Sequence, residues 1–151
     1  MKHKSHAPRA NHNFNVPTEV MGVPIEVDAG SHLIADARGI WPSKKIVVGA
    51  TYFALTEGEK RAVLHHEAAH CLKFHLEKRL LALPLLFLRP GIATSIAVNQ
   101  ELEADAFAAE CGLGVELLSF LTRMVGKDGQ FYPARAERMA ALRKFILGER
   151  K

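Results

Sequence analysis

The sequence predicts an α+β fold, with a small antiparallel β-sheet packed on a bundle of about four helices. Short apolar runs separated by turn residues come first, and the hydrophobic period changes to that of helices near residue 56. The chain has 151 residues, of which 48% are apolar and 24% charged. These values are typical of one globular domain with a substantial core.

The first 15 residues are polar and basic, and we expect a flexible tail there, before a single domain that spans residues 16–151. The net charge is +4, and much of the excess lies at the two ends of the chain. Neither end interleaves basic and aromatic residues in the way a nucleic-acid-binding surface does, so no nucleic-acid partner is expected. Two cysteines and the lack of an apolar secretory segment near the N-terminus indicate a cytoplasmic location. The oligomeric state is not predicted.

Three apolar runs are expected to form the strands, since turn residues such as DAGS and WPSK separate them. They cover residues 22–27, 32–37 and 45–50.

The first helix is expected from Thr56 to about Leu81. Thr56 and Glu59 have the spacing of a capping box, and neither glycine nor proline interrupts the segment after Glu59. Three further helices are expected from their periodicity, at residues 93–111, where Gly112 would end the helix, at 115–125 and at 134–147.

An apolar insert, residues 80–98, contains Pro84 and the sequence Arg-Pro-Gly at 89–91. Its longest uninterrupted part is too short to cross a bilayer as a helix. Three interpretations remain open: a helical hairpin in a soluble protein, a hydrophobic loop that contacts a membrane surface or grips unfolded substrate, and a membrane span.

The segment VLHHEAAHC carries the pattern HExxH within the first expected helix. His66 and His70 lie about 40° apart on the helical wheel, so both imidazoles can bind one Zn²⁺. Glu67 lies about 100° from His66, close enough to hold a metal-bound water and act as general base.

Three neighbours of this pattern fall on other faces of the same helix. We interpret His65 and His75 as surface or partly buried histidines, because neither can join the pair without unwinding the helix. Cys71 is interpreted as a small core residue.

A third ligand is expected from NQELEADAFAAEC, residues 99–111, because a catalytic zinc usually has three protein ligands. Glu101 and Asp105 share one face of this helix, and Ala104 would let the helix approach the first one closely. We expect Glu101 to bind the zinc and Asp105 to lie behind a ligand histidine and fix its tautomer. Glu103 is expected on the opposite side.

HHEAAH followed by ELEADAFAAE resembles the gluzincin metallopeptidases, above all the HtpX and CAAX-prenyl-protease type, whose signature is HExxH with a later ExxAD. LTEGEKRAVLHHEAAH resembles the segment that leads into the family's zinc helix, and YPARAERMAAL resembles its HPPxxERxxxL segment. The similarity covers about residues 22–146. Larger members place transmembrane hairpins between the histidines and the third ligand, so this chain is closer in size to the soluble minigluzincins.

The resemblance implies a zincin-like fold and a zinc-dependent endopeptidase with one Zn²⁺ per chain. Arg138 matches the family's arginine, and Tyr132 stands where the family has a histidine. Either residue is expected to help the zinc stabilise the tetrahedral oxyanion. A protein or peptide substrate would bind extended, as an added strand on the edge formed by residues 45–50 or 32–37.

Two other functions fit the same residues. One is a zinc peptidase of the ImmA/IrrE type, which acts on a regulatory protein, and the other is a non-catalytic zinc-binding protein. A further variation concerns regulation of the zinc endopeptidase: a histidine of the tail, His3, His6 or His12, would occupy the open zinc position and make the enzyme latent.

Overall fold

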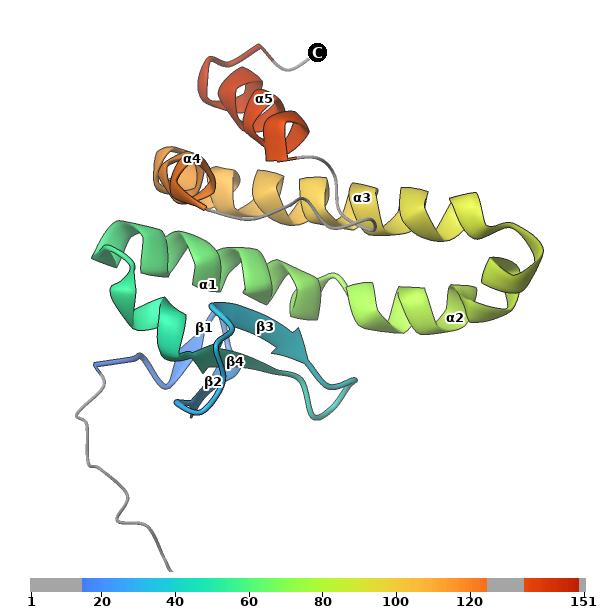
Figure 1. Ribbon diagram of the computed structural model, residues 1–151, viewed down its shortest axis with the longest axis horizontal. Helices are drawn as coiled ribbons and strands as arrows, with labels where there is room; N and C mark the ends of the chain where they lie inside the picture. The colour runs from blue at the N-terminus through green and yellow to red at the C-terminus, as the bar shows by residue number, and fades with distance from the viewer. Residues whose placement is uncertain (1–14, 125–134, 150–151) are drawn as a thin grey trace, which may run out of the picture.

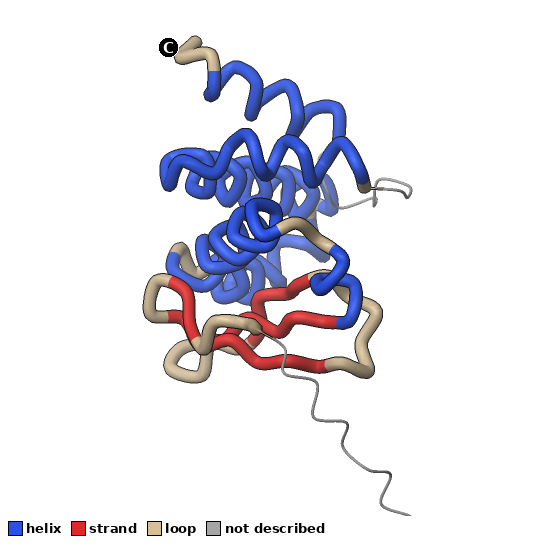
Figure 2. Tube along the Cα trace, turned by 90° about the vertical axis from the view of Figure 1, so that its left-hand side faces the viewer, coloured by secondary structure: helices blue, strands red, loops and turns tan. Residues whose placement is uncertain are grey.

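The computed structural model of the chain describes residues 15–124 and 135–149. A four-stranded sheet lies at one side and the helices are layered above it (Figure 1). The helix nearest the sheet is α1, which α2 continues beyond the sheet, while α3 runs back above both and is followed by α4 and α5 (Figure 1). Turned by 90°, the same arrangement shows the helices stacked in layers on one side of the strands (Figure 2). The predicted α+β fold is confirmed. The bounds are α1 Glu57–Leu72, α2 His75–Leu88, α3 Pro90–Ala108, α4 Gly114–Arg123 and α5 Arg135–Ile146.

The sheet is mixed, not antiparallel as we predicted. Its strands are β1 (Glu19–Val20), β2 (Val23–Asp28), β3 (Ala35–Arg38) and β4 (Lys45–Gly49), in the order β1-β2-β4-β3. The β2 and β4 strands pair in parallel, and the other two pairs are antiparallel.

The β4 strand is an interior strand, since β2 and β3 flank it. Its residues Ile46, Val47 and Val48 are at most 4% exposed, as expected for a strand covered on both faces. The prediction that residues 45–50 could be the edge that receives substrate is therefore wrong. Of the two strands we considered, β3 is the one at an edge.

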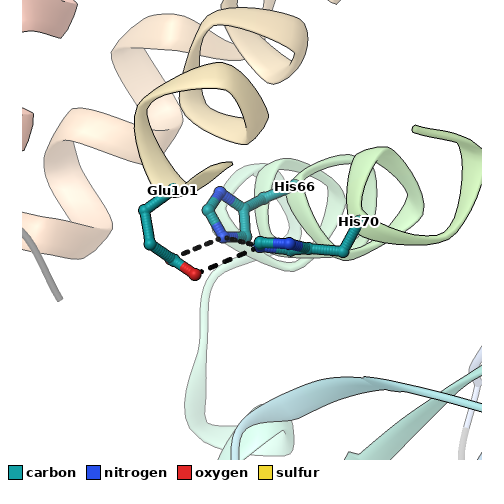
Figure 3. Close-up of side chains that lie close together, drawn as sticks. All are labelled: His66, His70 and Glu101. Carbon is teal, nitrogen blue, oxygen red and sulfur yellow. Dashed lines mark hydrogen bonds and ion pairs between the residues drawn. The ribbon is translucent and has the colours of Figure 1, made fainter. Parts of the chain in front are cut away.

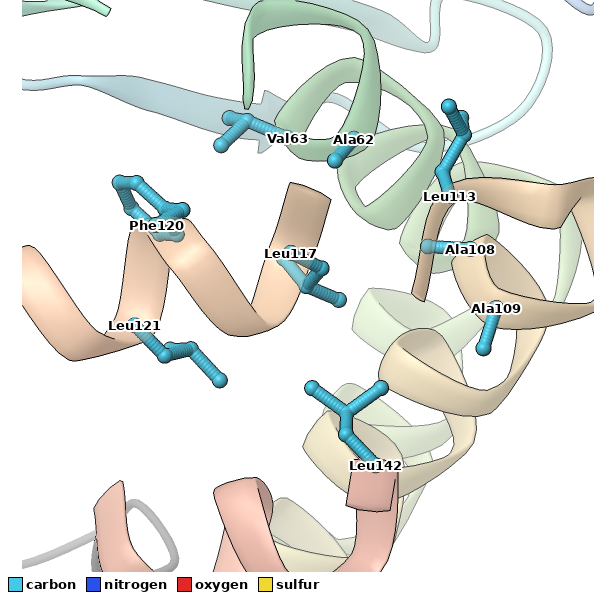
Figure 4. Packing of buried hydrophobic residues seen from close by; sticks show 9 residues of the cluster. All are labelled: Ala62, Val63, Ala108, Ala109, Leu113, Leu117, Phe120, Leu121 and Leu142. Atoms are coloured by element: carbon cyan, nitrogen blue, oxygen red, sulfur yellow. The ribbon is translucent and has the colours of Figure 1, made fainter. Parts of the chain in front are cut away.

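The α1 helix begins as the sequence predicts. Thr56 is the N-cap, its side chain accepts a hydrogen bond from the Glu59 N–H, and the Glu59 carboxylate accepts one from the Thr56 N–H, which completes the capping box. One face of α1 packs on the sheet, where Cys71 is buried as predicted. Its other face joins a cluster with the later helices (Figure 4). The cluster comprises Ala62, Val63, Ala108, Ala109, Leu113, Leu117, Phe120, Leu121 and Leu142.

The predicted continuous helix from Thr56 to Leu81 is wrong, because the helix breaks after Leu72. Phe74 has φ 58, in the left-handed region, and α2 starts at His75. The sequence gives no warning of the break, since a left-handed residue in this position is usually glycine or asparagine.

The apolar insert forms most of a helical hairpin, as the first of our three interpretations predicts. The α2 and α3 helices run antiparallel, and the turn between them lies at Arg89, beyond the edge of the sheet (Figure 1). Within the described part of the chain, no helix combines the length and the apolar character that crossing a membrane requires. Leu81 on α2 is 81% exposed, and contact of this hairpin with a membrane surface stays a prediction.

Three remaining expectations concern the chain ends and the later helices. Gly112 has φ 80 and interrupts the helical path between α3 and α4, as predicted. The α5 helix lies within the range predicted for it, and α4 begins one residue before its predicted range, at Gly114. The tail, with His3, His6 and His12, and Tyr132 lie outside the described residues.

Candidate metal centre

Three side chains from α1 and α3 point toward one another (Figure 3). Nε2 of His66 and Nε2 of His70 are 3.1 Å apart. Glu101 Oε2 lies 3.4 Å from Nε2 of His66, and Glu101 Oε1 lies 3.4 Å from Nε2 of His70. Within the described residues, this is the group of histidine, cysteine and acidic side chains whose ligand atoms are close enough to hold one metal ion.

These distances fit a zinc ion. Tetrahedral Zn²⁺ with bonds of about 2.0–2.1 Å keeps its ligand atoms about 3.3–3.4 Å apart, and the three separations observed here are 3.1, 3.4 and 3.4 Å. Two imidazoles and one carboxylate are also the donor set of several catalytic zinc sites, which leave one position open. His66, His70 and Glu101 would therefore hold the metal.

The close approach of α1 and α3 explains how Glu101 reaches the histidines. Ala104 and Ala108 are both 0% exposed on α3, so small side chains stand where larger ones would separate the helices. Because residues 101, 104, 105 and 108 recur at helical spacing, the same face carries Glu101 and Asp105.

Asp105 lies behind His66, as predicted. Its Oδ1 is 2.9 Å from Nδ1 of His66. Arg138 of α5 donates two hydrogen bonds to the same carboxylate, of 2.7 and 2.8 Å, and its Nη1 lies 3.6 Å from Glu101 Oε2. Burial alone would raise the pKa of Asp105, but its contacts with His66 and Arg138 outweigh burial and lower it. Asp105 therefore stays ionised, at a position from which it would orient the His66 ring.

The protonation of the three ligands is uneven. Burial disfavours a charged His66, but Asp105 and Glu101 outweigh burial and raise its pKa to about 9. Burial and the charge of His66 lower the pKa of His70 to about 3. For Glu101, burial acts upward, yet the contact with His66 lowers the pKa to about 2. The proton on His66 is the one that a metal ion must displace.

Glu67 lies between the metal ligands and the sheet. Its Oε2 accepts a 2.9 Å hydrogen bond from the backbone N–H of Ala37 in the edge strand β3. Burial raises the pKa of Glu67 above its ordinary value, against the opposing charge of His66. A carboxylate with a raised pKa beside a metal site is suited to accept and return a proton.

Two hollows meet at this site. Both are lined by Ala35, His66, Glu67 and Glu101. One extends toward charged side chains, among them Lys44, Glu77 and Arg79. The other extends toward apolar side chains, among them Ile34, Leu117, Phe120 and Met124. The arrangement is a cleft along β3, with the candidate metal ligands near its middle.

The comparison with known protein families supports this site. Residues 5–96 match the model of peptidase family M48, which is more than half of the chain. The chain belongs to peptidase family M48. M48 peptidases depend on a metal, in agreement with the group of His66, His70 and Glu101. No match was found among curated proteins or solved structures.

The M48 match includes the sheet, α1 and α2, and thus His66, Glu67 and His70. Glu101 and Asp105 lie beyond the matched residues, so their place in the M48 site comes from the sequence spacing and the structure. Arg138 also lies beyond the match. Its guanidinium is bonded to Asp105, and a contact with an oxyanion stays a prediction.

Sequence reasoning missed two residues next to the ligands of this M48 protein. His75 is buried, at 1% exposure, and its Nδ1 lies 2.8 Å from Nδ1 of His70, where we had expected it on the far face of a continuous helix. Glu103 does not point to the opposite side, because it contacts His75 and Lys73. Both residues were missed because the sequence did not reveal the break between α1 and α2.

Proposed function

We propose that this M48 member is a zinc-dependent endopeptidase that uses Glu67 as general base. The observation that carries the proposal is the spacing of the ligand atoms of His66, His70 and Glu101, with Glu67 facing the same cleft. When bound, Zn²⁺ would supply the Lewis acid that acidifies a water molecule and polarises the scissile carbonyl.

Glu67 would take the proton of the attacking water and later pass it to the leaving amine. The Ala37 N–H holds one carboxylate oxygen, Oε2, so we assign Oε1 as the base. Asp105 keeps the His66 ring oriented, and Arg138 neutralises the carboxylates of Asp105 and Glu101. Tyr132 or Arg138 would add to oxyanion stabilisation.

The substrate would be a protein or peptide that lies extended along β3. This strand is at the sheet edge, and the hydrogen bond from the Ala37 N–H to Glu67 means that the edge away from β4 faces the cleft. Addition of a strand reads the substrate backbone, which would leave sequence preference broad. The apolar end of the cleft supports a preference for an apolar side chain on one side of the scissile bond.

The test is cleavage of casein, with zinc content measured on the same preparations. Glu67→Gln should keep about one zinc per chain and lose cleavage by at least about 100-fold, the lower range for a general base. Glu101→Ala should lower the zinc content. A Glu67→Gln variant as active as the unmodified protein would refute the assigned base.

Glu57→Gln is the matched control, since Glu57 lies on the same helix with its side chain 81% exposed. It should keep both zinc and activity. Full zinc content without any cleavage in the unmodified protein would favour the non-catalytic alternative. Cleavage confined to a regulatory protein would favour the ImmA/IrrE-type alternative.

A further inference from the structure

The break between α1 and α2 brings His75 back onto the metal site. Phe74 takes the left-handed conformation, which is strained for a residue other than glycine. The residue is 47% exposed, so burial does not offset this strain. Lys44 holds the turn from outside, because its Nζ donates to the Cys71 carbonyl at 2.6 Å and lies 3.4 Å from the centre of the Phe74 ring.

The turn aligns His75 with His70. The two Nδ1 atoms are 2.8 Å apart, and the ring centres are 4.8 Å apart at 77°. His75 Nε2 lies 3.1 Å from Glu103 Oε2, and Lys73 Nζ donates to Glu103 Oε1 at 2.9 Å. The Gln100 side chain donates to the His75 carbonyl at 3.1 Å, which fixes the start of α2 against α3.

The direction of each hydrogen bond follows from the requirement that the His70 nitrogen facing the metal site carries no proton. Nε2 of His70 faces His66 and Glu101, so it must be unprotonated to bind a metal, and the proton of His70 resides on Nδ1. That N–H donates to Nδ1 of His75, and the proton of His75 must then reside on Nε2, from which it is donated to Glu103. A single arrangement of protons satisfies every contact.

We propose that His75 is a positioning residue, which holds the ring and the tautomer of His70 as Asp105 holds those of His66. Glu103, itself paired with Lys73, polarises the His75 ring so that its Nδ1 is a better acceptor of the hydrogen bond from His70. This inference rests on the proposed zinc site but not on peptidase activity. It predicts that His75 strengthens metal binding, although it never touches the metal.

The experiment compares His75→Leu with His75→Asn. Leucine removes the acceptor at the position of Nδ1, while asparagine places a carbonyl oxygen near it. We expect the zinc affinity, measured by competition with a chelator, to fall about 10- to 100-fold in His75→Leu, the range for loss of a ligand's hydrogen-bond partner. His75→Asn should recover part of that loss. The visible absorption spectrum of Co²⁺ bound to the same site should change in His75→Leu and return toward the original in His75→Asn.

His65→Leu is the matched control, because His65 lies on α1 next to His66, but its Nδ1 contacts the Arg61 carbonyl and not a candidate metal ligand. It should leave the affinity and the cobalt spectrum unchanged. A purely structural role of His75 predicts lower stability in chelator with unchanged zinc affinity and cobalt spectrum, and that result would overturn the proposal.

A second variant, Glu103→Gln, tests the proposal even if His75→Leu does not fold. Glu103 is on the surface, with its side chain 44% exposed, so Glu103→Gln should fold even where His75→Leu does not. We expect it to weaken zinc binding about 3- to 10-fold, less than full loss of the partner; an unchanged affinity would overturn the proposal. Zinc binding without cleavage in the unmodified protein refutes only the proposed function, and wild-type affinity in Glu101→Ala refutes the metal site itself.

Discussion

The buried carboxylate of Glu59 should make the stability of the chain depend on pH in acid. Glu59 is 1% exposed and accepts hydrogen bonds from the Thr56 N–H and hydroxyl, from Ser119, and from Arg123 of α4. Burial favours the neutral acid, but Arg123 and the Thr56 N–H outweigh burial and lower the pKa to about 2. This carboxylate joins the start of α1, the helix that carries His66 and His70, to α4.

The size of the effect follows from the pKa. The fall from 4.5 to about 2 corresponds to about 3 kcal/mol of unfolding free energy, at about 1.4 kcal/mol per unit. Because Arg123 is 53% exposed, solvent screens the ion pair and we expect about 2 kcal/mol. The folded pKa is lowered, so this contribution is complete above about pH 4.5 and is lost as the pH falls toward 2.

Glu59→Gln isolates the effect, since glutamine does not titrate. Urea unfolding followed by far-ultraviolet circular dichroism, with a chelator present, should show the variant less stable by about 2 kcal/mol at pH 7. The difference between the two proteins should shrink between pH 4.5 and pH 2. Other carboxylates titrate in both proteins and cancel in the difference.

A difference that stays constant down to pH 2, or one below about 0.5 kcal/mol at pH 7, would refute this reasoning. Glu57→Gln is the control, because Glu57 lies in the same first turn but its side chain is 81% exposed and pairs with Lys60 at the surface. It should change the stability by less than about 0.5 kcal/mol at every pH.

Three further predictions concern the metal centre. Ala104→Leu should cost about 1–3 kcal/mol by overpacking a residue that is 0% exposed and should weaken zinc binding by displacing Glu101; an unchanged urea midpoint would contradict it. Zinc affinity, corrected for the chelator's own protonation, should rise about tenfold per pH unit from pH 6 to 8, because His66 with its pKa of about 9 must lose a proton; a flat profile would rule out that proton. Arg138→Met should cost about 3 kcal/mol in urea unfolding, because it leaves the Asp105 carboxylate buried without its guanidinium partner; a loss under about 1 kcal/mol would show the pair to be dispensable.

The grouping of His66, His70 and Glu101 was predictable because it depends largely on helical periodicity. His66 and His70 share one face of α1, whose start the capping box marks. Glu101 and Asp105 share one face of α3, and the small alanine side chains on that face allow α3 to pack closely against α1. Local spacing determines these relations, whatever the rest of the fold does.

The errors arose where tertiary contacts override local pattern. The helix breaks at Phe74, where neither glycine nor proline stands, because Lys44 and the contacts of His75 with α3 hold the turn. The error over β4 is of another kind, because its interior place could have been predicted from the sequence. The uninterrupted apolar run Ile-Val-Val is typical of a strand covered on both faces and not of an edge strand. The parallel pairing of β2 with β4 depends on the path of the chain between them and has no local pattern.

The length of the α2–α3 hairpin can change without moving the candidate metal ligands. Gln100 and His75 meet at its base, where His70 and Glu101 also lie, whereas Arg89 lies at its far end. The three candidate ligands, His66, His70 and Glu101, therefore lie near the base of the hairpin and not near its turn. The entropy cost of closing a longer connection between α2 and α3 grows only slowly with its length. Such a protrusion is a natural place for insertion of a foreign segment: an anchor, a tether or a second module could be grafted at its apex while the catalytic face kept its shape.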